Sequence, residues 1–303
     1  MKRDKILYLM NPISGTRSKK VLRNKIENIT RSAIIDFTFE GTTQDGNYDH
    51  LVDYIKTERF NKIGICGGDG SVNQVVNALA HLDIPFGIIP MGSGNGLALT
   101  ANIPKNPEKA LEILFTGKPA LTDGFMINNR FACMLAGLGF DAGVAHEFAE
   151  QESRGLKTYA RLTTRHFFTA PFYPFTISAN GLRFDTEAFF ISVANSNQFG
   201  NSFTIAPEAL LNDGLLDIVI VKKTAKPLLL LNVVKQVLLG KVKTAENSLQ
   251  QSIIYFQTDQ LTIENPSKAP LHIDGEPSET ESRFEIKILP NFFKLIRPRA
   301  GVN

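Results

Sequence analysis

Five residues, Gly67-Gly68-Asp69-Gly70-Ser71, constrain the fold of this chain more than any other segment. They follow an apolar run at residues 63–66 that is typical of a strand, and they precede residues 72–79, which are typical of a helix. Because glycine has no Cβ, backbone N–H groups at such a turn can close on a phosphate, and the helix N-terminus adds a partial positive charge. An acid inside the loop would repel a phosphate unless a cation lies between them, which favours Mg-nucleotide chemistry.

The first third of the chain alternates predicted strands with predicted helices. The pattern favours strands at residues 5–10, 33–39, 62–66 and 86–89, and helices at residues 18–29, 48–57, 72–82, 97–101 and 107–115. This alternation is typical of an α/β domain with a parallel sheet and helices on both faces. Ligands of such sheets bind at the carboxyl ends of the strands, where the glycine segments of this chain lie.

The pattern changes after about residue 117. Turn residues such as Asn180-Gly181 separate predicted strands at residues 121–127, 131–138, 172–179, 187–194, 216–221, 253–256, 260–263, 271–273 and 284–289, with predicted helices at residues 142–150, 156–168 and 227–239. We expect an antiparallel, β-sandwich-like second domain. The predicted boundaries are residues 1–120 for a nucleotide-binding α/β domain and residues 121–290 for a β-rich domain. We expect residues 292–296, and with them residues 291–303, to return to the first domain.

Composition excludes several classes of protein. The formal net charge is only +3 and no basic run stands out, so we expect no nucleic-acid partner. Two cysteines, Cys66 and Cys133, both in apolar surroundings, argue against a disulfide framework and for a reducing cytosol. No segment reaches the roughly 20 apolar residues that span a bilayer. We therefore expect a cytoplasmic protein without a transmembrane segment, which could still rest on a membrane.

Three further segments carry polar or glycine-rich chemistry. Asn11-Pro12-Ile13-Ser14-Gly15 follows the first predicted strand, although an ordinary strand-end turn explains it as well. The stretch from Pro90 to Ala98, which contains Gly92-Ser93-Gly94-Asn95-Gly96, follows another strand and forms a second backbone cradle. That much glycine costs conformational entropy, which favours function over a plain loop. In the third segment, His272-Ile273-Asp274-Gly275-Glu276-Pro277, a surface hairpin turn is the simpler interpretation, but a carboxylate there could act as a base.

Together these segments resemble the diacylglycerol kinase catalytic family, which includes bacterial lipid kinases and sphingosine kinases. The resemblance covers nearly the whole chain and extends to its order and spacing. It rests on the segments at residues 11–15, 67–71 and 92–98, on Gly139-Phe140-Asp141-Ala142, on Ala206-Pro207-Glu208-Ala209 followed by Asn212-Asp213-Gly214-Leu215-Leu216-Asp217, and on Ile273-Asp274-Gly275-Glu276. It implies an N-terminal domain like those of NAD kinase and phosphofructokinase, and transfer of the ATP γ-phosphate to a lipid hydroxyl. The acceptor would be a diacylglycerol-like or sphingoid-base-like lipid at the membrane surface.

The resemblance also implies roles for individual residues. ATP would be held by Asn11, Thr42, Gly67, Gly68, Asp69, Gly70, Ser71, Val72, Asn73, Ser93, Gly94 and Asn95. Asp69 would help to place Mg²⁺ through water, and Glu276 would be the base that takes the hydroxyl proton. A structural Mg²⁺ would bind the Asp213 side chain and the Leu210 and Leu215 carbonyls. Phosphoryl transfer depends on positioning and charge neutralisation, which these groups could supply.

Two departures from the family's pattern leave alternatives open. Many bacterial diacylglycerol kinases carry an acid where this chain has Gly96, and relatives often have three glycines in place of Phe199-Gly200-Asn201-Ser202. A kinase for a soluble substrate such as NAD would share the first glycine loop but not the second. A nucleotide or lipid sensor that has lost catalysis is the alternative that Gly96 raises, although Asp69 and Glu276 are intact. The oligomeric state is left open, with a homodimer as one arrangement.

Overall fold

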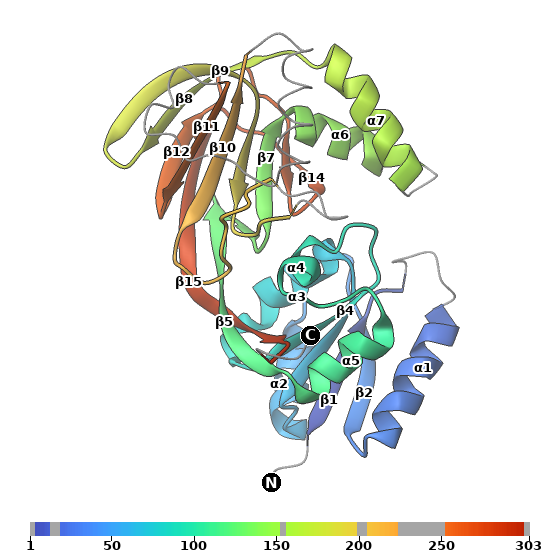
Figure 1. The fold of residues 1–303 in the computed structure, drawn as a ribbon. Helices are drawn as coiled ribbons and strands as arrows, with labels where there is room; N and C mark the ends of the chain where they lie inside the picture. Colours follow the sequence, from blue (N-terminus) through green and yellow to red (C-terminus); the bar gives the residue numbers. More distant parts are fainter. Residues whose placement is uncertain (1–3, 13–18, 152–155, 199–204, 224–251, 300–303) are drawn as a thin grey trace. The chain divides into compact units, whose positions relative to one another are not determined.

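The computed structural model describes residues 4–12, 19–151, 156–198, 205–223 and 252–299 (Figure 1). The chain divides into two compact units, Met1–Thr122 with Asn291–Asn303, and Asp123–Pro290. It passes between them inside two strands, β5 (Lys118–Ile127) and β15 (Arg283–Arg297). The helix expected at residues 227–239 and the departure at residues 199–202 lie outside the described residues.

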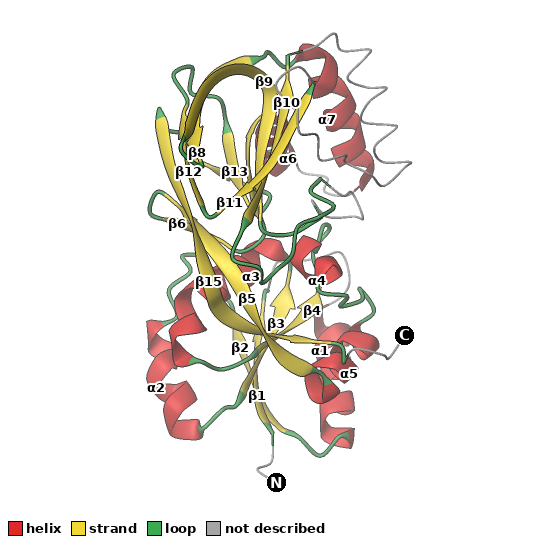
Figure 2. Ribbon diagram, turned by 60° about the vertical axis from the view of Figure 1, so that its left-hand side comes forward, coloured by secondary structure: helices red, strands yellow, loops and turns green. Residues whose placement is uncertain are grey.

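Unit 1 is an α/β layer structure. Its remaining elements are β1 (Lys5–Met10), α1 (Lys19–Ser32), β2 (Asp36–Gly41), α2 (Asp49–Glu58), β3 (Lys62–Gly67), α3 (Asp69–Leu79), the 3₁₀ turn η1 (Ala80–Leu82), β4 (Phe86–Pro90), α4 (Gly96–Thr100) and α5 (Pro107–Thr116). The strands pair in parallel in the order β15-β4-β3-β1-β2. Figures 1 and 2 show α1 and α5 on one side of this sheet and α2 and α3 on the other.

Local sequence explains these helices. In α1 the apolar residues Leu22, Ile26 and Ile29 recur every three or four positions, and Leu22 and Ile26 are buried against the sheet and α5. At the start of α5, the Asn106 side chain accepts the N–H groups of Glu108 and Lys109, while Pro107 occupies the first helical position. The parallel order then brings the carboxyl ends of β1, β2, β3 and β4 to one edge of the sheet.

Unit 2 is built from antiparallel pairs. Its further elements are β6 (Arg130–Ala132), β7 (Leu135–Gly139), α6 (Phe140–Ala149), α7 (Leu156–Thr169), β8 (Tyr173–Ala179), β9 (Leu182–Ala194), β10 (Leu216–Lys222), β11 (Ile253–Thr258), β12 (Gln260–Glu264), β13 (Leu271–Ile273) and β14 (Glu276–Ser278). The strand order is β14-β13-β7-β9-β8-β12-β15, and β10 pairs with both β9 and β11. Their inward side chains form one apolar core that includes Phe125, Phe175 and Phe284.

Several strands differ from the expected bounds, and β14 was not expected as a strand. The strand expected over residues 131–138 is broken into β6 and β7, because the N–H groups of Cys133 and Met134 donate to the side chain of Asp274 instead of a neighbouring strand. The strand expected at residues 284–289 is longer and continues as β15 to Arg297, through the segment expected to return to the first domain. The strand β9 begins at Leu182, five residues before the expected start at residue 187, because it pairs with β8 from the Asn180-Gly181 turn onward.

Among the described residues, no helix is both long enough and apolar enough to cross a membrane.

Candidate functional site

The first glycine segment turns β3 into α3, with Gly68 directly before the helix. Gly67 lies so close to α3 that a Cβ there would come within 2.5 Å of the Ser71 Cβ. Asn11, which follows β1, donates its backbone N–H to the Cys66 carbonyl at 3.0 Å and its side-chain amide to the Ser71 hydroxyl at 2.8 Å. These bonds tie the turn after β1 to the glycine loop, beside the partly positive N-terminus of α3.

The second glycine segment follows β4 and packs against the first, backbone to backbone. A Cβ on Gly92 would lie 2.7 Å from the Gly68 Cα, and one on Gly68 would lie 3.1 Å from the Gly92 Cα. The Met91 N–H donates to the Gly67 carbonyl at 2.8 Å. The buried Asn95 side chain accepts the Gly92 N–H at 2.9 Å and donates to the Gly92 carbonyl at 2.6 Å. A side chain at Gly68 or Gly92 would therefore force the two loops apart.

Asp69 joins the two segments through its carboxylate. Its Oδ2 accepts the N–H of Gly96 at 3.1 Å and its Oδ1 accepts the N–H of Leu97 at 3.3 Å, and these are the first two residues of α4. The N–H groups of a first helical turn have no partner within the helix, so a carboxylate there stabilises it. Gly96, which departs from the family's pattern, thus contributes its backbone to the same carboxylate that was expected to place Mg²⁺.

The remaining residues predicted to hold a nucleotide lie at the same edge of the sheet. Thr42 follows β2 and donates its N–H to the Met10 carbonyl at 3.1 Å. The Val72 side chain is buried in the core, so only its backbone faces the loop. Ser93 is exposed, and its carbonyl accepts from the Lys105 Nζ at 3.4 Å. The partly exposed residues of the two segments include Gly68, Asp69, Gly70, Asn73, Gly92 and Gly94. The carboxyl edge of unit 1 thus brings together all the residues that the sequence assigned to nucleotide binding.

The predicted base lies on a hairpin of unit 2. Asp274 and Gly275 join β13 to β14, and their φ values of 50° and 85° are those of a two-residue turn in which both central residues are left-handed. Glu276 is the first residue of β14, pairs with Ile273 across the hairpin and is exposed. The sequence therefore predicted the turn, and the structure shows that it holds an accessible carboxylate.

Asp274 anchors that hairpin. Its buried carboxylate accepts the backbone N–H groups of Cys133 at 2.9 Å, Met134 at 2.8 Å and Leu135 at 2.9 Å. Its own N–H donates to the Leu135 carbonyl at 2.7 Å. The turn that precedes Glu276 is consequently fixed to the segment between β6 and β7.

The predicted magnesium ligands lie on the turn before β10. Leu210 is 58% exposed, and the exposed Asp213 accepts the Leu215 N–H at 3.1 Å through Oδ1. Two residues further on, Asp217 is fully buried, and Tyr255 donates its hydroxyl to the Asp217 Oδ1. Among the described residues the other oxygen, Oδ2, has no hydrogen-bond partner.

An unpaired, buried carboxylate oxygen suits a hard cation. Burial, together with the nearby carboxylates of Asp213 and Glu208, raises the pKa of Asp217 to about 6. Mg²⁺ prefers oxygen ligands and keeps several waters, so Asp213, the two predicted carbonyls and this acidic surrounding fit it. In the part of the chain that the structure describes, no three His, Cys, Asp or Glu side chains gather as a metal centre, so such a site depends on carbonyls and water as well.

Sequence reasoning assigned no role to several buried acids. Asp123, in β5, accepts the Gly214 N–H at 2.8 Å and so ties that strand to the turn that carries Asp213. Asp123 and Asp217 each lie inside an apolar strand. Because acids are seldom buried without a partner, this position in the sequence could have marked both residues as structurally important.

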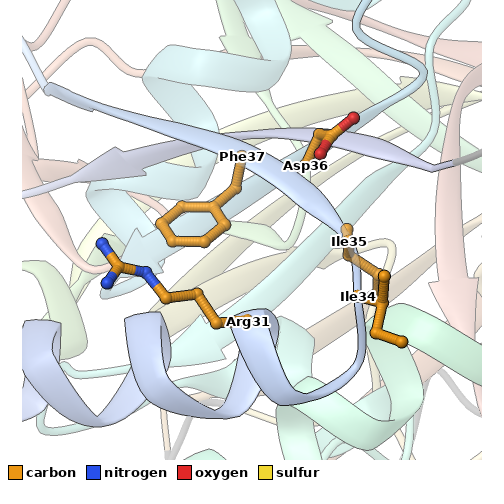
Figure 3. A pocket seen from close by; sticks show the side chains of 5 residues that line it. All are labelled: Arg31, Ile34, Ile35, Asp36 and Phe37. Carbon is orange, nitrogen blue, oxygen red and sulfur yellow. The ribbon is translucent and has the colours of Figure 1, made fainter.

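Figure 3 shows a hollow elsewhere in unit 1, where α1 ends and β2 begins. It is lined by Arg31, Ile34, Ile35, Asp36 and Phe37. The Arg31 guanidinium lies 5.9 Å from the centre of the Phe37 ring. Because β2 starts here, the hollow lies at the opposite end of the sheet from the glycine loops and takes no part in the candidate site.

Comparison with known proteins identifies the family of this chain. The model of the diacylglycerol kinase catalytic domain matches residues 5–127, and that of the YegS C-terminal NAD kinase beta sandwich-like domain matches residues 135–297. The chain belongs to the diacylglycerol kinase catalytic family. The predicted family is confirmed, and so is the fold class, an N-terminal domain with a parallel sheet followed by a β-sandwich-like domain.

Members of this family resemble the chain over most of its length. A "Probable lipid kinase YegS-like" of Enterobacter sp. is 31% identical over 74% of this chain and 74% of its own. A "Diacylglycerol kinase" of Bacillus subtilis is 29% identical over 91% of this chain and 90% of its own. A crystal structure of a diacylglycerol kinase from Bacillus anthracis has a TM-score of 0.76 and 24% identity, with full coverage of both chains, and supports the fold. The chain is therefore a member of a lipid kinase family.

Proposed function

We propose that this protein is an ATP-dependent lipid kinase that transfers the γ-phosphate to a lipid hydroxyl. The observation that carries the proposal is the meeting of two glycine loops at the carboxyl edge of unit 1, in a chain of this family. Gly68 and Gly92 pack backbone to backbone beside the N-terminus of α3, and the N–H groups of a first helical turn can bind a phosphate. Phosphate binding on a backbone cradle is what positions a nucleotide for phosphoryl transfer.

The chemistry follows from the residues in each unit. Asn11, Thr42, residues 67–73 and residues 93–95 hold ATP, and Asp69 places Mg²⁺ through water while it caps α4. When bound, Mg²⁺ neutralises charge on the phosphates. Glu276 takes the proton of the acceptor hydroxyl, since it is an exposed carboxylate on an anchored turn and is accessible to a substrate. A second Mg²⁺ at Asp213, Leu210 and Leu215 is structural.

The acceptor is a diacylglycerol-like or sphingoid-base-like alcohol, and the protein works in the cytoplasm at the surface of a membrane. Lipid tails stay in the bilayer or in an apolar groove while the hydroxyl reaches the kinase.

The test is phosphorylation of a panel of acceptors with ATP and Mg²⁺ in mixed micelles. Diacylglycerol, monoacylglycerol, sphingosine and ceramide are compared, with NAD as the soluble acceptor. We expect one lipid to be phosphorylated and the product to be lost in Glu276→Gln. Glu279→Gln, a neighbouring exposed glutamate outside the proposed site, serves as the matched control and keeps the activity. Phosphorylation of NAD alone would replace the proposal by a soluble-substrate kinase, and nucleotide binding without any turnover would favour a sensor.

A further inference from the structure

His272 is a buried residue of the hairpin that carries Glu276. None of its surface is exposed, and it lies on β13. The Gly275 N–H donates to its Nδ1 at 3.3 Å, and its Nε2 lies 3.3 Å from Oδ2 of Asp141 at the start of α6. A nitrogen that accepts an N–H carries no proton, so the proton of this imidazole is on Nε2 and is donated to Asp141. One ring therefore bonds both the Asp274-Gly275 turn and α6.

The surroundings leave this ring little freedom. Gly137, on β7, is the residue opposite His272 in the strand pairing. A Cβ at Gly137 would collide with the Asp141 carboxylate and with the His272 Nε2. The bond between His272 and Asp141 thus passes through the space that any other residue at position 137 would fill. Helix α6 packs on β7, β13 and β14 together, so the pair lies between the helix and the hairpin.

The two bonds have different consequences. The contact from Gly275 stabilises the turn itself, because Gly275 immediately precedes Glu276. The contact with Asp141 fixes the rotation of the ring and keeps the proton on Nε2, so that Nδ1 remains an acceptor for that turn. Asp141 also accepts the Ala142 N–H at 2.9 Å through Oδ1, which holds the carboxylate on α6.

We propose that His272, held by Asp141, is a positioning residue that sets the Glu276 carboxylate for proton transfer. This inference rests on the proposed function, in which Glu276 is the base. A base must lie within hydrogen-bond reach of the proton that it takes, and a misplacement of about 1 Å can cost about 100-fold in rate. Loss of the imidazole should therefore lower kcat while the KM for ATP, set by unit 1, stays unchanged.

The experiment compares variants that keep one bond or the other. Asn at position 272 places an amide oxygen where Nδ1 lies and can still accept the Gly275 N–H, whereas Leu removes both bonds. We expect His272→Leu to lower kcat by about 10- to 100-fold at constant KM for ATP, and His272→Asn to recover most of it. His272→Gln, which can reach Asp141 but not the turn, should resemble Leu. Equal kcat values for wild type and His272→Leu would overturn the proposal.

His146, which lies on α6 like Asp141, provides a matched control. Its Nε2 bonds the Leu271 carbonyl at 2.8 Å, so it also links α6 to β13, but without contact to the Asp274-Gly275 turn. His146→Leu should lose stability comparably and keep its kcat. An equal loss of kcat in His146→Leu would show that the effect is general loosening of unit 2 and would contradict a positioning role.

A second measurement separates this inference from the proposed function. The ¹⁵N spectrum of the His272 imidazole and the hydrogen exchange of the Gly275 amide need no substrate. We expect an unprotonated Nδ1, a protonated Nε2 and a protected amide that becomes exchangeable in the conservative His272→Gln variant. If Glu276→Gln retains full turnover, the proposed function fails on its own account. A proton on Nδ1, or a Gly275 amide unaffected by His272→Gln, would overturn the positioning role whatever the activity.

Discussion

The carboxylate of Asp69 accepts the backbone N–H of Gly96 at 3.1 Å, so the acid of the first glycine loop caps the short helix that follows the second. One residue thereby links the first loop to the helix that follows the second. The same carboxylate is the group proposed to place Mg²⁺. Loss of the Asp69 carboxylate should therefore lower both the free energy of unfolding and the turnover, and two substitutions at this position separate the effects.

We expect Asp69→Asn to lower turnover at least 100-fold, because Asn removes the negative charge that would hold a cation yet keeps an oxygen that can accept an N–H. Asp69→Ala should in addition lose about 0.5–2 kcal/mol of unfolding free energy, the usual value of a helix cap. The control is Asn106→Ala, which removes the cap of α5. It should lose similar stability in urea unfolding while turnover stays at the wild-type level. Wild-type turnover in Asp69→Asn would remove this residue from the chemistry.

Gly92→Ala should weaken ATP binding by at least tenfold. The new Cβ would lie 2.7 Å from the Gly68 Cα, and because both atoms belong to backbone the two loops must separate. A Cβ on Gly41 would meet nothing within 4 Å, so Gly41→Ala is the matched control. ATP affinity measured by calorimetry decides the point. If both variants bind ATP like the wild type, the backbone cradle is not the phosphate site.

Mg²⁺ should raise the thermal stability of the protein in the absence of nucleotide. A cation bound by Asp213 would reduce the repulsion between this carboxylate and the buried Asp217, and a ligand that binds only the folded state stabilises it by mass action. Asp213→Ala should abolish this rise. In EDTA, Asp217→Asn should unfold no more easily than wild type, since it removes a buried charge. An unchanged Mg²⁺ effect in Asp213→Ala would contradict the assigned ligand.

Both thiols should resist alkylation in the folded protein. Cys66 is fully buried and Cys133 is 1% exposed. Burial raises the pKa of the Cys66 thiol well above its ordinary value, so its reactive thiolate stays scarce even at pH 9. Titration with a thiol reagent should find two reactive groups only after guanidinium unfolding. A group that reacts within seconds in the native protein would be inconsistent with this packing.

Local patterns predicted much of unit 1. The apolar run, the glycines and the helical stretch around Asp69 are adjacent in sequence, so the turn from β3 into α3 could be placed from sequence. Parallel topology then predicted that Asn11, directly after the first strand, would reach the same edge, whereas Thr42 was assigned by the family resemblance alone. The Asn180-Gly181 turn between β8 and β9 was predicted for a similar reason, because both residues adopt the positive φ that such turns require.

Contacts between residues far apart in the sequence could not be predicted from local patterns. The break between β6 and β7 arises from Asp274, which lies 140 residues away from Met134 in sequence. The hydrogen bond between Asp141 and His272 joins residues 131 positions apart, and no sequence pattern near either residue predicts this contact. The sequence shows Asp217 as an acid inside an apolar strand. Its hydrogen-bond donors on β11, however, can be identified only once the pairing of β10 with β11 is known.

The most direct test of the central claim is transfer of radiolabelled γ-phosphate from ATP to a lipid in mixed micelles, measured for wild type and Glu276→Gln at equal protein concentration. The account predicts a labelled lipid product with wild type, and a loss of at least 100-fold with Glu276→Gln while ATP binding is retained. An undiminished rate in Glu276→Gln would contradict the assigned base, and an absence of labelled lipid with every acceptor would contradict the lipid kinase itself.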